Sequence, residues 1–255
     1  YLTSEAWNTF NIRIVPDNVQ THLAVEVEAL PSSSGLLNKV GEEILSHTMS
    51  LTLKGTINGY DIMFLRNKMH NLHYLDLTEV DVIANPYEYY QGCHTEDHRI
   101  SGHAFDGTKK LISVKLPKNI TYIGQSAFAH CSYLKDVTLY EGISNIDENA
   151  FFESGIERIE IPELNTVVYG ASFKEKYIRE SKLKDFTPKE EDKDLVKIMV
   201  LHGDLGNNET GEYNPLLFKE IEESKMDYIA LGHIHKPEVI KENAITSIKD
   251  QNQSG

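Results

Sequence analysis

Three stretches of the chain repeat one pattern of apolar residues. Ile100, Ile123 and Ile146 recur at a spacing of 23 residues, and an Ala-Phe pair follows each of them after three residues. A short polar turn and an alternating apolar run of Leu, Val and Ile come next, one residue early in the third copy. A period between about 20 and 50 residues predicts stacked coils, because one coil buries its apolar face only against a neighbour.

Residues 51–163 predict a solenoid, since a looser form of the pattern precedes these copies. Leucine pairs at Leu51–Leu53 and Leu75–Leu77 lie 24 residues apart, and Ile62–Met69 between them predicts a short helix on the convex side. The alternating apolar residues therefore place at least five short strands in one stack.

Residues 1–50 predict an N-terminal cap. Alternating apolar residues predict a strand at His22–Val27, and the spacing within Leu36–Leu45 is helical. A cap is needed because the outer face of a terminal coil would otherwise stand in water. A further run at Phe10–Ile14 predicts an edge strand, for which we have no functional interpretation.

A segment rich in tyrosine and histidine, residues 85–98, interrupts the period and predicts a surface loop. Its tyrosines and histidines are Tyr87, Tyr89, Tyr90, His94 and His98, and the first four are the candidate binding residues. Exposed aromatic side chains are common in recognition surfaces, so this loop is the binding candidate of the solenoid. A solvated loop without a ligand is the alternative.

The unit I-x3-A-F-x5-L-x2-V-x-L resembles the BspA-like leucine-rich repeat over about residues 45–163. The resemblance implies a curved solenoid whose short strands line one face. BspA-like proteins are mostly secreted or surface-attached binding proteins. It therefore implies a non-enzymatic module for a protein or glycan ligand, without a cofactor.

A different pattern begins near Asn165, after the period stops at Ile161. Apolar runs predict buried strands at 166–170, 196–201 and 228–231, and a helix opening at Pro215. The stretch 174–184 alternates charges and predicts a solvated helix rather than a DNA-binding groove. Alternation of strand, helix and strand predicts an α/β segment over residues 164–255.

Two motifs in this segment, LHGD at Leu201–Asp204 and LGHIH at Leu231–His235, resemble the C-terminal half of an SbcD-type calcineurin-like metallophosphoesterase. A strand directs alternate side chains to one side, so both histidines of the second motif face one site. The resemblance implies that His202 and His233 bind one metal and His235 another. Two manganese, zinc or iron ions would then activate water for attack on a phosphodiester.

The family's earlier motifs, of the form D-x-H, G-D and G-N-H-[DE], are absent from the residues that precede this segment. Three neutral histidines without carboxylates do not neutralise two divalent cations. We therefore expect the chain to be inactive alone, with any missing half supplied by another chain. A half-domain with apolar strands also predicts an interface with the solenoid or self-association.

The formal charge of −14 argues against broad adhesion to nucleic acid or anionic lipid. No apolar run reaches the length of a membrane span. Of the two cysteines, Cys131 stands at a repeat position and predicts a buried thiol. The two resemblances imply different locations. The leucine-rich repeat favours a secreted or cell-surface protein, and the phosphoesterase segment favours a cytoplasmic one.

Two function classes remain open from the sequence. In the first, the protein is a solenoid that binds protein or glycan, and the later segment is a remnant, an engineered fusion or a join of unrelated sequences. In the second, it is a manganese-dependent phosphoesterase or DNA exonuclease completed by a partner, and only this class involves nucleic acid.

Overall fold

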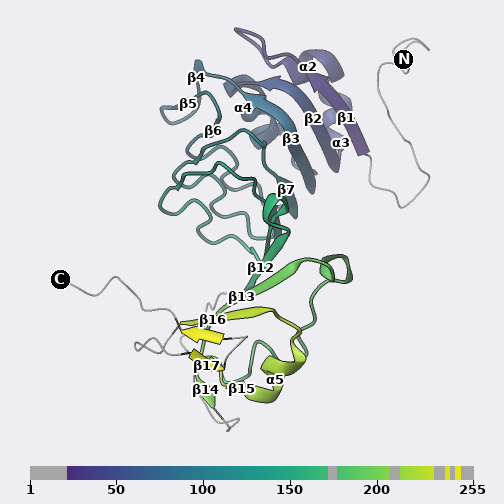
Figure 1. The fold of residues 1–255 in the computed structure, drawn as a ribbon. Coiled ribbons are helices and arrows are strands. Elements are labelled where there is room, and N and C mark those ends of the chain that lie inside the picture. Colours follow the sequence, from purple (N-terminus) through teal and green to yellow (C-terminus); the bar gives the residue numbers. More distant parts are fainter. Residues whose placement is uncertain (1–21, 172–176, 207–212, 233–238, 242–244, 248–255) are drawn as a thin grey trace, which may run out of the picture. The chain divides into compact units, whose positions relative to one another are not determined.

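The computed structural model describes residues 22–171, 177–206, 213–232, 239–241 and 245–247, which belong to two compact units (Figure 1). Unit 1 spans Tyr1–Ile156 and unit 2 spans Glu157–Gly255. Short strands predominate and helices are few, so the mixed α/β class is confirmed. The predicted strand at Phe10–Ile14 lies outside the described residues.

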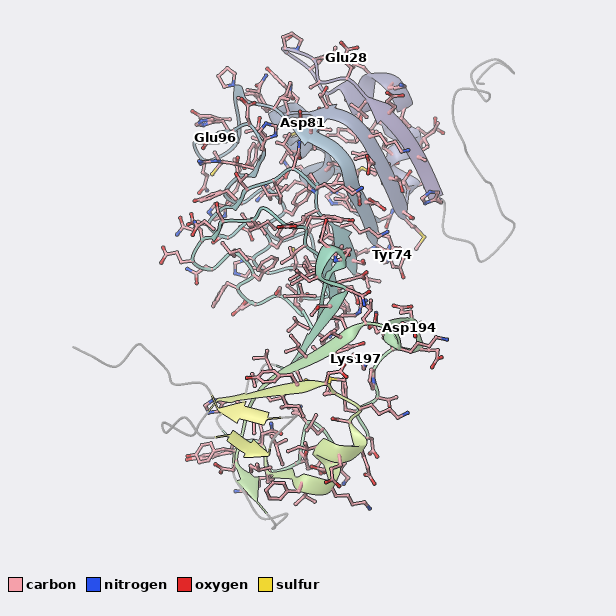
Figure 2. All side chains as sticks on the ribbon, viewed as in Figure 1. Glu28, Tyr74, Asp81, Glu96, Asp194 and Lys197 are labelled. Atoms are coloured by element: carbon pink, nitrogen blue, oxygen red, sulfur yellow. The ribbon has the colours of Figure 1, made fainter. Side chains whose placement is uncertain are left out.

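The main sheet of unit 1 is a ladder of parallel strands in the order β1-β2-β3-β7-β9. Tyr74 and Asp81 mark the two ends of β3 in Figure 2. Leu75 of β3 pairs with Leu51 of β2 and with Val114 of β7, so the early and late repeats share one ladder. The strands of this ladder are β1 (His22–Val27), β2 (Ser50–Ile57), β3 (Tyr74–Val82), β7 (Ser113–Lys115) and β9 (Asp136–Thr138).

A second parallel ladder joins the coils on another side, in the order β10-β8-β6. Its strands are β6 (Arg99–Ile100), β8 (Tyr122–Ile123) and β10 (Asn145–Ile146). Between the ladders, Phe128 stacks on Phe105 at 5.1 Å and on Phe151 at 5.4 Å between ring centroids. The predicted repeat register is confirmed, because equivalent residues of successive coils meet directly.

Three short helices cover the beginning of the ladder, namely α2 (Gly35–Val40), α3 (Glu42–His47) and α4 (Gly59–Lys68). The single helix predicted over residues 36–45 is wrong in one respect, because it divides at Gly41. The φ of this glycine is 92°, which a helix cannot contain and which glycine adopts without a steric penalty.

A buried carboxylate holds the first helices of unit 1 together. Asp61 accepts hydrogen bonds from the Ser34 hydroxyl at 2.7 Å and from the backbone N–H groups of Leu36 and Asn58. It thus caps the N-termini of both α2 and α4. Burial raises the pKa of Asp61, although these hydrogen bonds partly offset the increase.

Unit 2 contains a sheet in the order β11-β12-β13-β16-β18-β17, in which β12, β13, β16 and β18 are parallel. The outer strands β11 and β17 are antiparallel to their neighbours. The strands of this sheet are β11 (Arg158–Ile161), β12 (Thr166–Gly170), β13 (Val196–His202), β16 (Tyr228–Gly232), β17 (Val239–Lys241) and β18 (Ile245–Ser247). The three predicted strands form as β12, β13 and β16, although β13 is buried on only one face.

The helix of unit 2 begins later than predicted. Leu216 and Leu217 form β15, which pairs with β14 (Leu205–Gly206), so α5 covers only Phe218–Glu223. Two 3-10 turns, η1 (Pro162–Leu164) and η2 (Glu190–Asp192), complete the described elements.

Two other expectations for unit 2 are wrong. The solvated helix over 174–184 does not form in its described part, where Ile178 makes a β-bridge to Tyr213, and residues 172–176 lie outside the description. The burial predicted for the strand at 196–201 also holds for only one face of β13. Met199 is 2% exposed, whereas Val196 and Val200 are 46% and 48% exposed.

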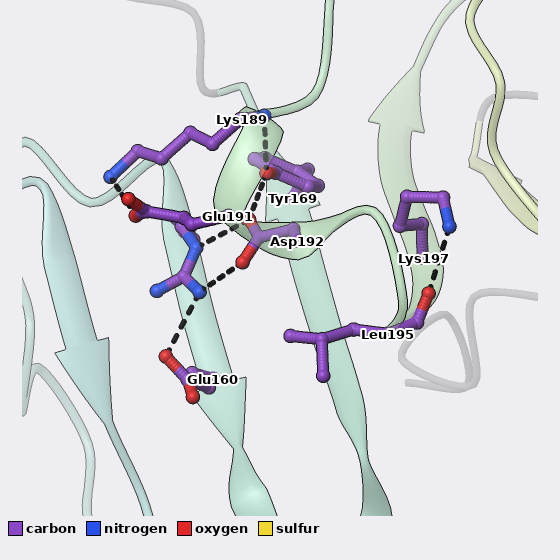
Figure 3. Close-up of polar contacts among 8 residues, drawn as sticks. Glu160, Tyr169, Lys189, Glu191, Asp192, Leu195 and Lys197 are labelled. Atoms are coloured by element: carbon purple, nitrogen blue, oxygen red, sulfur yellow. Dashed lines mark hydrogen bonds and ion pairs between the residues drawn. The ribbon is translucent and has the colours of Figure 1, made fainter.

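A buried ion-pair network fixes η2 to the first strands of unit 2 (Figure 3). Arg158 donates to both carboxylate oxygens of Asp192, at 2.8 and 2.5 Å, and its terminal nitrogen also contacts Glu160. The Tyr169 hydroxyl donates to Asp192 and accepts from the Lys189 N–H. Burial, together with the bond to Asp192, raises the pKa of Tyr169 to about 12.

Replacing Phe128 by Ala should lower the free energy of unfolding by about 3–5 kcal/mol, because the change leaves a cavity between two stacked rings. Phe152→Ala is the matched control, since Phe152 is 50% exposed and Phe128 is 0% exposed. Urea titration followed by circular dichroism measures both. Equal losses for the two variants would contradict the central position of Phe128.

Asp192→Ala should destabilise unit 2 by about 3–5 kcal/mol, because it leaves Arg158 buried and unpaired. Burial alone would raise the pKa of Asp192, but hydrogen bonds from Arg158 and Tyr169 and the Arg158 charge lower it overall. The stabilisation is therefore complete above an unfolded-state pKa of about 3.9 and is lost as the pH falls through the lower folded value.

Thermal melts between neutral pH and about pH 3 measure this loss, with Glu190→Ala as the control because the Glu190 side chain is 90% exposed. A difference between wild type and Asp192→Ala that stays constant across this range would contradict the assignment.

Candidate functional site

The segment predicted as a loop is a hairpin. β4 (Asn85–Tyr90) pairs antiparallel with β5 (Cys93–Thr95), and the two-residue turn consists of Gln91 and Gly92 with φ values of 39° and 83°. Positive φ at both turn residues matches the twist of two paired strands. The sequence contained the signal, because Gln-Gly separates two short runs of strand-forming residues. Glu96 lies just beyond the end of β5 (Figure 2).

Tyr89 anchors this hairpin and is not itself available to a ligand. Its side chain is buried, and its hydroxyl donates to the Gly102 carbonyl at 2.6 Å. Burial raises the pKa of Tyr89, with the nearby Cys93 as a smaller cause. The expectation that all four candidate residues face solvent is therefore wrong for Tyr89.

Tyr87 and Tyr90 are half-buried and held by ring contacts. Tyr87 stacks on Tyr60 of α4, with centroids 3.8 Å apart and planes 18° apart. The Arg66 guanidinium lies 4.0 Å above the Tyr90 ring. His94 is exposed, and its Nδ1 lies 3.4 Å from the Gly92 carbonyl oxygen. The hairpin thus combines two fixed aromatic rings with a solvent-facing imidazole.

A carboxylate beside the hairpin joins two histidines that sequence reasoning missed. Asp106 accepts a hydrogen bond from Nδ1 of His103 and another from Nδ1 of His130, each at 2.9 Å. Burial raises its pKa, but these two bonds and the nearby imidazoles lower it overall. Tyr90 lies over His103, with ring centroids 5.1 Å apart, so the cluster adjoins the hairpin. Its only sequence signal is the 24-residue spacing of Asp106 and His130.

Charged residues along the β3 region of unit 1 pair with one another. Lys115 lies 3.2 Å from Asp76, and Lys118 lies 2.8 Å from Glu79. Burial raises the pKa of Asp76, but bonds from Thr78 and the Lys115 charge lower it overall. These charges offer less to a ligand than the aromatic hairpin does.

The structure describes only one of the three predicted metal ligands. His202 ends β13 and is exposed, and it pairs in register with Gly232 at the end of β16. A Cβ atom added at Gly232 would lie 3.0 Å from the His202 ring. The ends of these two strands therefore approach each other closely. His233 and His235 lie outside the described residues. Among the residues that are described, no group of three His, Cys, Asp or Glu side chains is arranged to hold a metal ion.

The two cysteines differ in burial. Cys131 is fully buried, as predicted, and burial raises the pKa of its thiol to about 12. Cys93 of the hairpin is half-buried, and burial also raises its pKa.

Comparison with known proteins identifies one region of the chain. Residues 98–189 match the BspA type leucine-rich repeat region, in six copies. No curated protein matches the chain, and nothing in these comparisons supports the phosphoesterase resemblance. The match extends past Ile161, at which the sequence period stops. No helix in the described ranges has the length and apolar character needed to cross a bilayer. The chain therefore contains a BspA-type leucine-rich repeat region.

Proposed function

We propose that this protein is a non-enzymatic binding module that recognises a protein or a glycan through the β4–β5 hairpin. The observation that supports this most directly is the anchored hairpin. Tyr89 fixes the turn end of β4 to the Gly102 carbonyl, while Tyr87, Tyr90 and His94 remain at least partly accessible. A surface that is ordered before binding loses less conformational entropy when the ligand arrives.

The composition of the hairpin suits either class of ligand. Tyrosine rings give a large contact area with few rotatable bonds, and their hydroxyls donate and accept hydrogen bonds. The Arg66 guanidinium lies over one face of the Tyr90 ring, so a cation is held beside the hairpin and the ring is fixed in place. BspA-type repeats support a secreted or surface location for this module.

The double variant Tyr87→Ala, Tyr90→Ala should reduce binding at least about tenfold, because rigid aromatic anchors carry much of the energy of an interface. The measurement is binding of labelled protein to immobilised glycans and to extracellular matrix proteins. Tyr133→Ala is the control, since Tyr133 is 63% exposed elsewhere in unit 1. Thermal melts must first show that the variants fold. Unchanged binding by the folded double variant would overturn the hairpin assignment.

A metal-dependent phosphoesterase of the SbcD type is the second candidate, with its missing half supplied by another chain. One observation favours it: β13 and β16 are adjacent parallel strands whose C-terminal ends bring His202 beside Gly232, immediately before His233. Two manganese ions would supply an activated water in such a site. The described residues do not by themselves provide enough ligands, so we derive no reaction step through a metal.

Unit 2 also has a surface suited to self-association. Val196 and Val200 are exposed on the face of β13 opposite its buried residues. An apolar sheet face without a cover favours contact with a second chain. This contact would be an alternative use of the face that a phosphoesterase partner would occupy.

The purified chain with manganese should not hydrolyse bis-p-nitrophenyl phosphate. The reason is that the motifs which supply the carboxylate ligands of the phosphoesterase metal site do not precede this segment. Release of nitrophenolate measures the rate, and His233→Ala is the companion variant. Hydrolysis by the wild-type chain that His233→Ala abolishes would contradict the binding-module proposal. Metal uptake that occurs only after a partner is added would support the second candidate instead.

A further inference from the structure

The last coil described in unit 1 has an open edge that differs from the equivalent edges of earlier coils. Ile100 and Ile123 are 1% and 0% exposed, but Ile146 at the same repeat position is 47% exposed. Phe105 and Phe128 are buried, whereas Phe151 is only partly buried. Among the residues that the structure describes, no further coil covers the apolar surface that each earlier coil gives to its neighbour.

The backbone of this edge is also uncovered. In the two earlier coils, N–H groups of residues 103, 105 and 107, and then 126, 128 and 130, donate to carbonyls of the next coil. The corresponding groups belong to Asn149, Phe151 and Glu153, and none has a hydrogen-bond partner among the described residues. Residues 103, 107, 126, 130, 149 and 153 all have positive φ, so the same turn aims these donors in every coil.

Acceptors complete the same edge. The carbonyls of His98 and Ile100 accept from Thr121 and Gly124, and those of Thr121 and Ile123 accept from Ser144 and Asp147. The next carbonyls in this series belong to Ser144 and Ile146, for which no partner exists within the described part. We call these two carbonyls and the three N–H groups of Asn149, Phe151 and Glu153 the open coil edge.

The charge of this coil restricts what fits the open coil edge. Residues 141–157 contain acidic side chains at Glu141, Asp147, Glu148, Glu153 and Glu157 and no Lys, Arg or His. Hydrogen-bond donors of the preceding coil contact two of these carboxylates: Tyr122 donates to Asp147, and Gln125 donates to Glu148. A second copy of this chain would instead oppose carboxylates with carboxylates, at a net charge of −14 for each copy.

We propose that the open coil edge binds an extended segment of a partner protein in which lysine or arginine side chains flank an apolar residue. The partner backbone continues the coil-to-coil hydrogen bonds, and its apolar side chain covers Ile146 and Phe151. Its cations meet Glu148 and Glu153. Addition of a strand to an exposed edge draws affinity from backbone bonds and specificity from side chains. This surface lies apart from the hairpin and goes beyond the proposed function.

The test uses the full chain and a fluorescein-labelled peptide of about ten residues in which lysine and isoleucine alternate. Fluorescence anisotropy should give a Kd of about 10 μM, and a peptide with glutamate in place of lysine should not bind. Ile146→Asp should weaken binding at least about tenfold, because it places a charge in the apolar centre. Hydrogen exchange of the wild type should show slower exchange at the amides of Asn149, Phe151 and Glu153 when the peptide is present.

A matched pair of variants separates this contact from general attraction to an acidic protein. Glu148→Gln, Glu153→Gln should weaken binding at least about threefold, whereas Glu42→Gln, Glu43→Gln on α3 makes the same charge change and should have little effect.

Equal weakening by the two double variants, or unchanged amide exchange on adding peptide, would overturn the proposal. So would self-association of the wild type that Ile146→Asp abolishes, since the occupant would then be a second copy.

Discussion

The solenoid depends on one constraint, that a coil buries its phenylalanine only when another coil lies on each side. Phe128 satisfies the constraint, with Phe105 on one face and Phe151 on the other. Hydrogen bonds follow the same rule in part, because alternate N–H groups of each turn donate to the next coil, while those between them donate within the turn. The stability of such a stack is approximately a sum of the contacts between neighbouring coils. Its two terminal coils therefore lack the contacts of one neighbour.

The beginning of the stack and its last described coil meet this constraint differently. At the beginning, three helices cover the ladder, and Asp61 caps two of them with one buried carboxylate. Desolvating that carboxylate costs free energy, which three hydrogen bonds partly offset. At the last coil of unit 1 the repeat positions carry the same residue types, yet Ile146 is exposed. Identical residues thus have different energies according to whether a neighbour is present.

Much of this fold could be predicted from the sequence, because apolar spacing specifies which residues meet. The period of 23 placed Ile, Ala and Phe correctly in three coils, and apolar runs located β12, β13 and β16. Local backbone chemistry was harder to predict. A single glycine at position 41 divides a helix whose apolar spacing is continuous, and the Gln91 and Gly92 turn converts an expected loop into a hairpin.

Long-range polar contacts could not be predicted at all. Asp106 and His130 belong to different coils, and Arg158 contacts Asp192 across 34 positions of sequence. The first contact leaves only the 24-residue spacing of Asp106 and His130 as a signal, and the second leaves no periodic signal. The same limit applies to the hairpin, where the sequence identifies four candidate residues but not the burial of Tyr89.

The place at which the hairpin enters the chain has a consequence for how this protein can diversify. β4 and β5 lie between β3 and β6, and β3 nevertheless pairs directly with β7. The ladder therefore passes the insertion without using it. The turn of the hairpin can be lengthened, shortened or substituted while the spacing of the coils stays fixed. The sequence of the hairpin can therefore change without altering the stack that supports it.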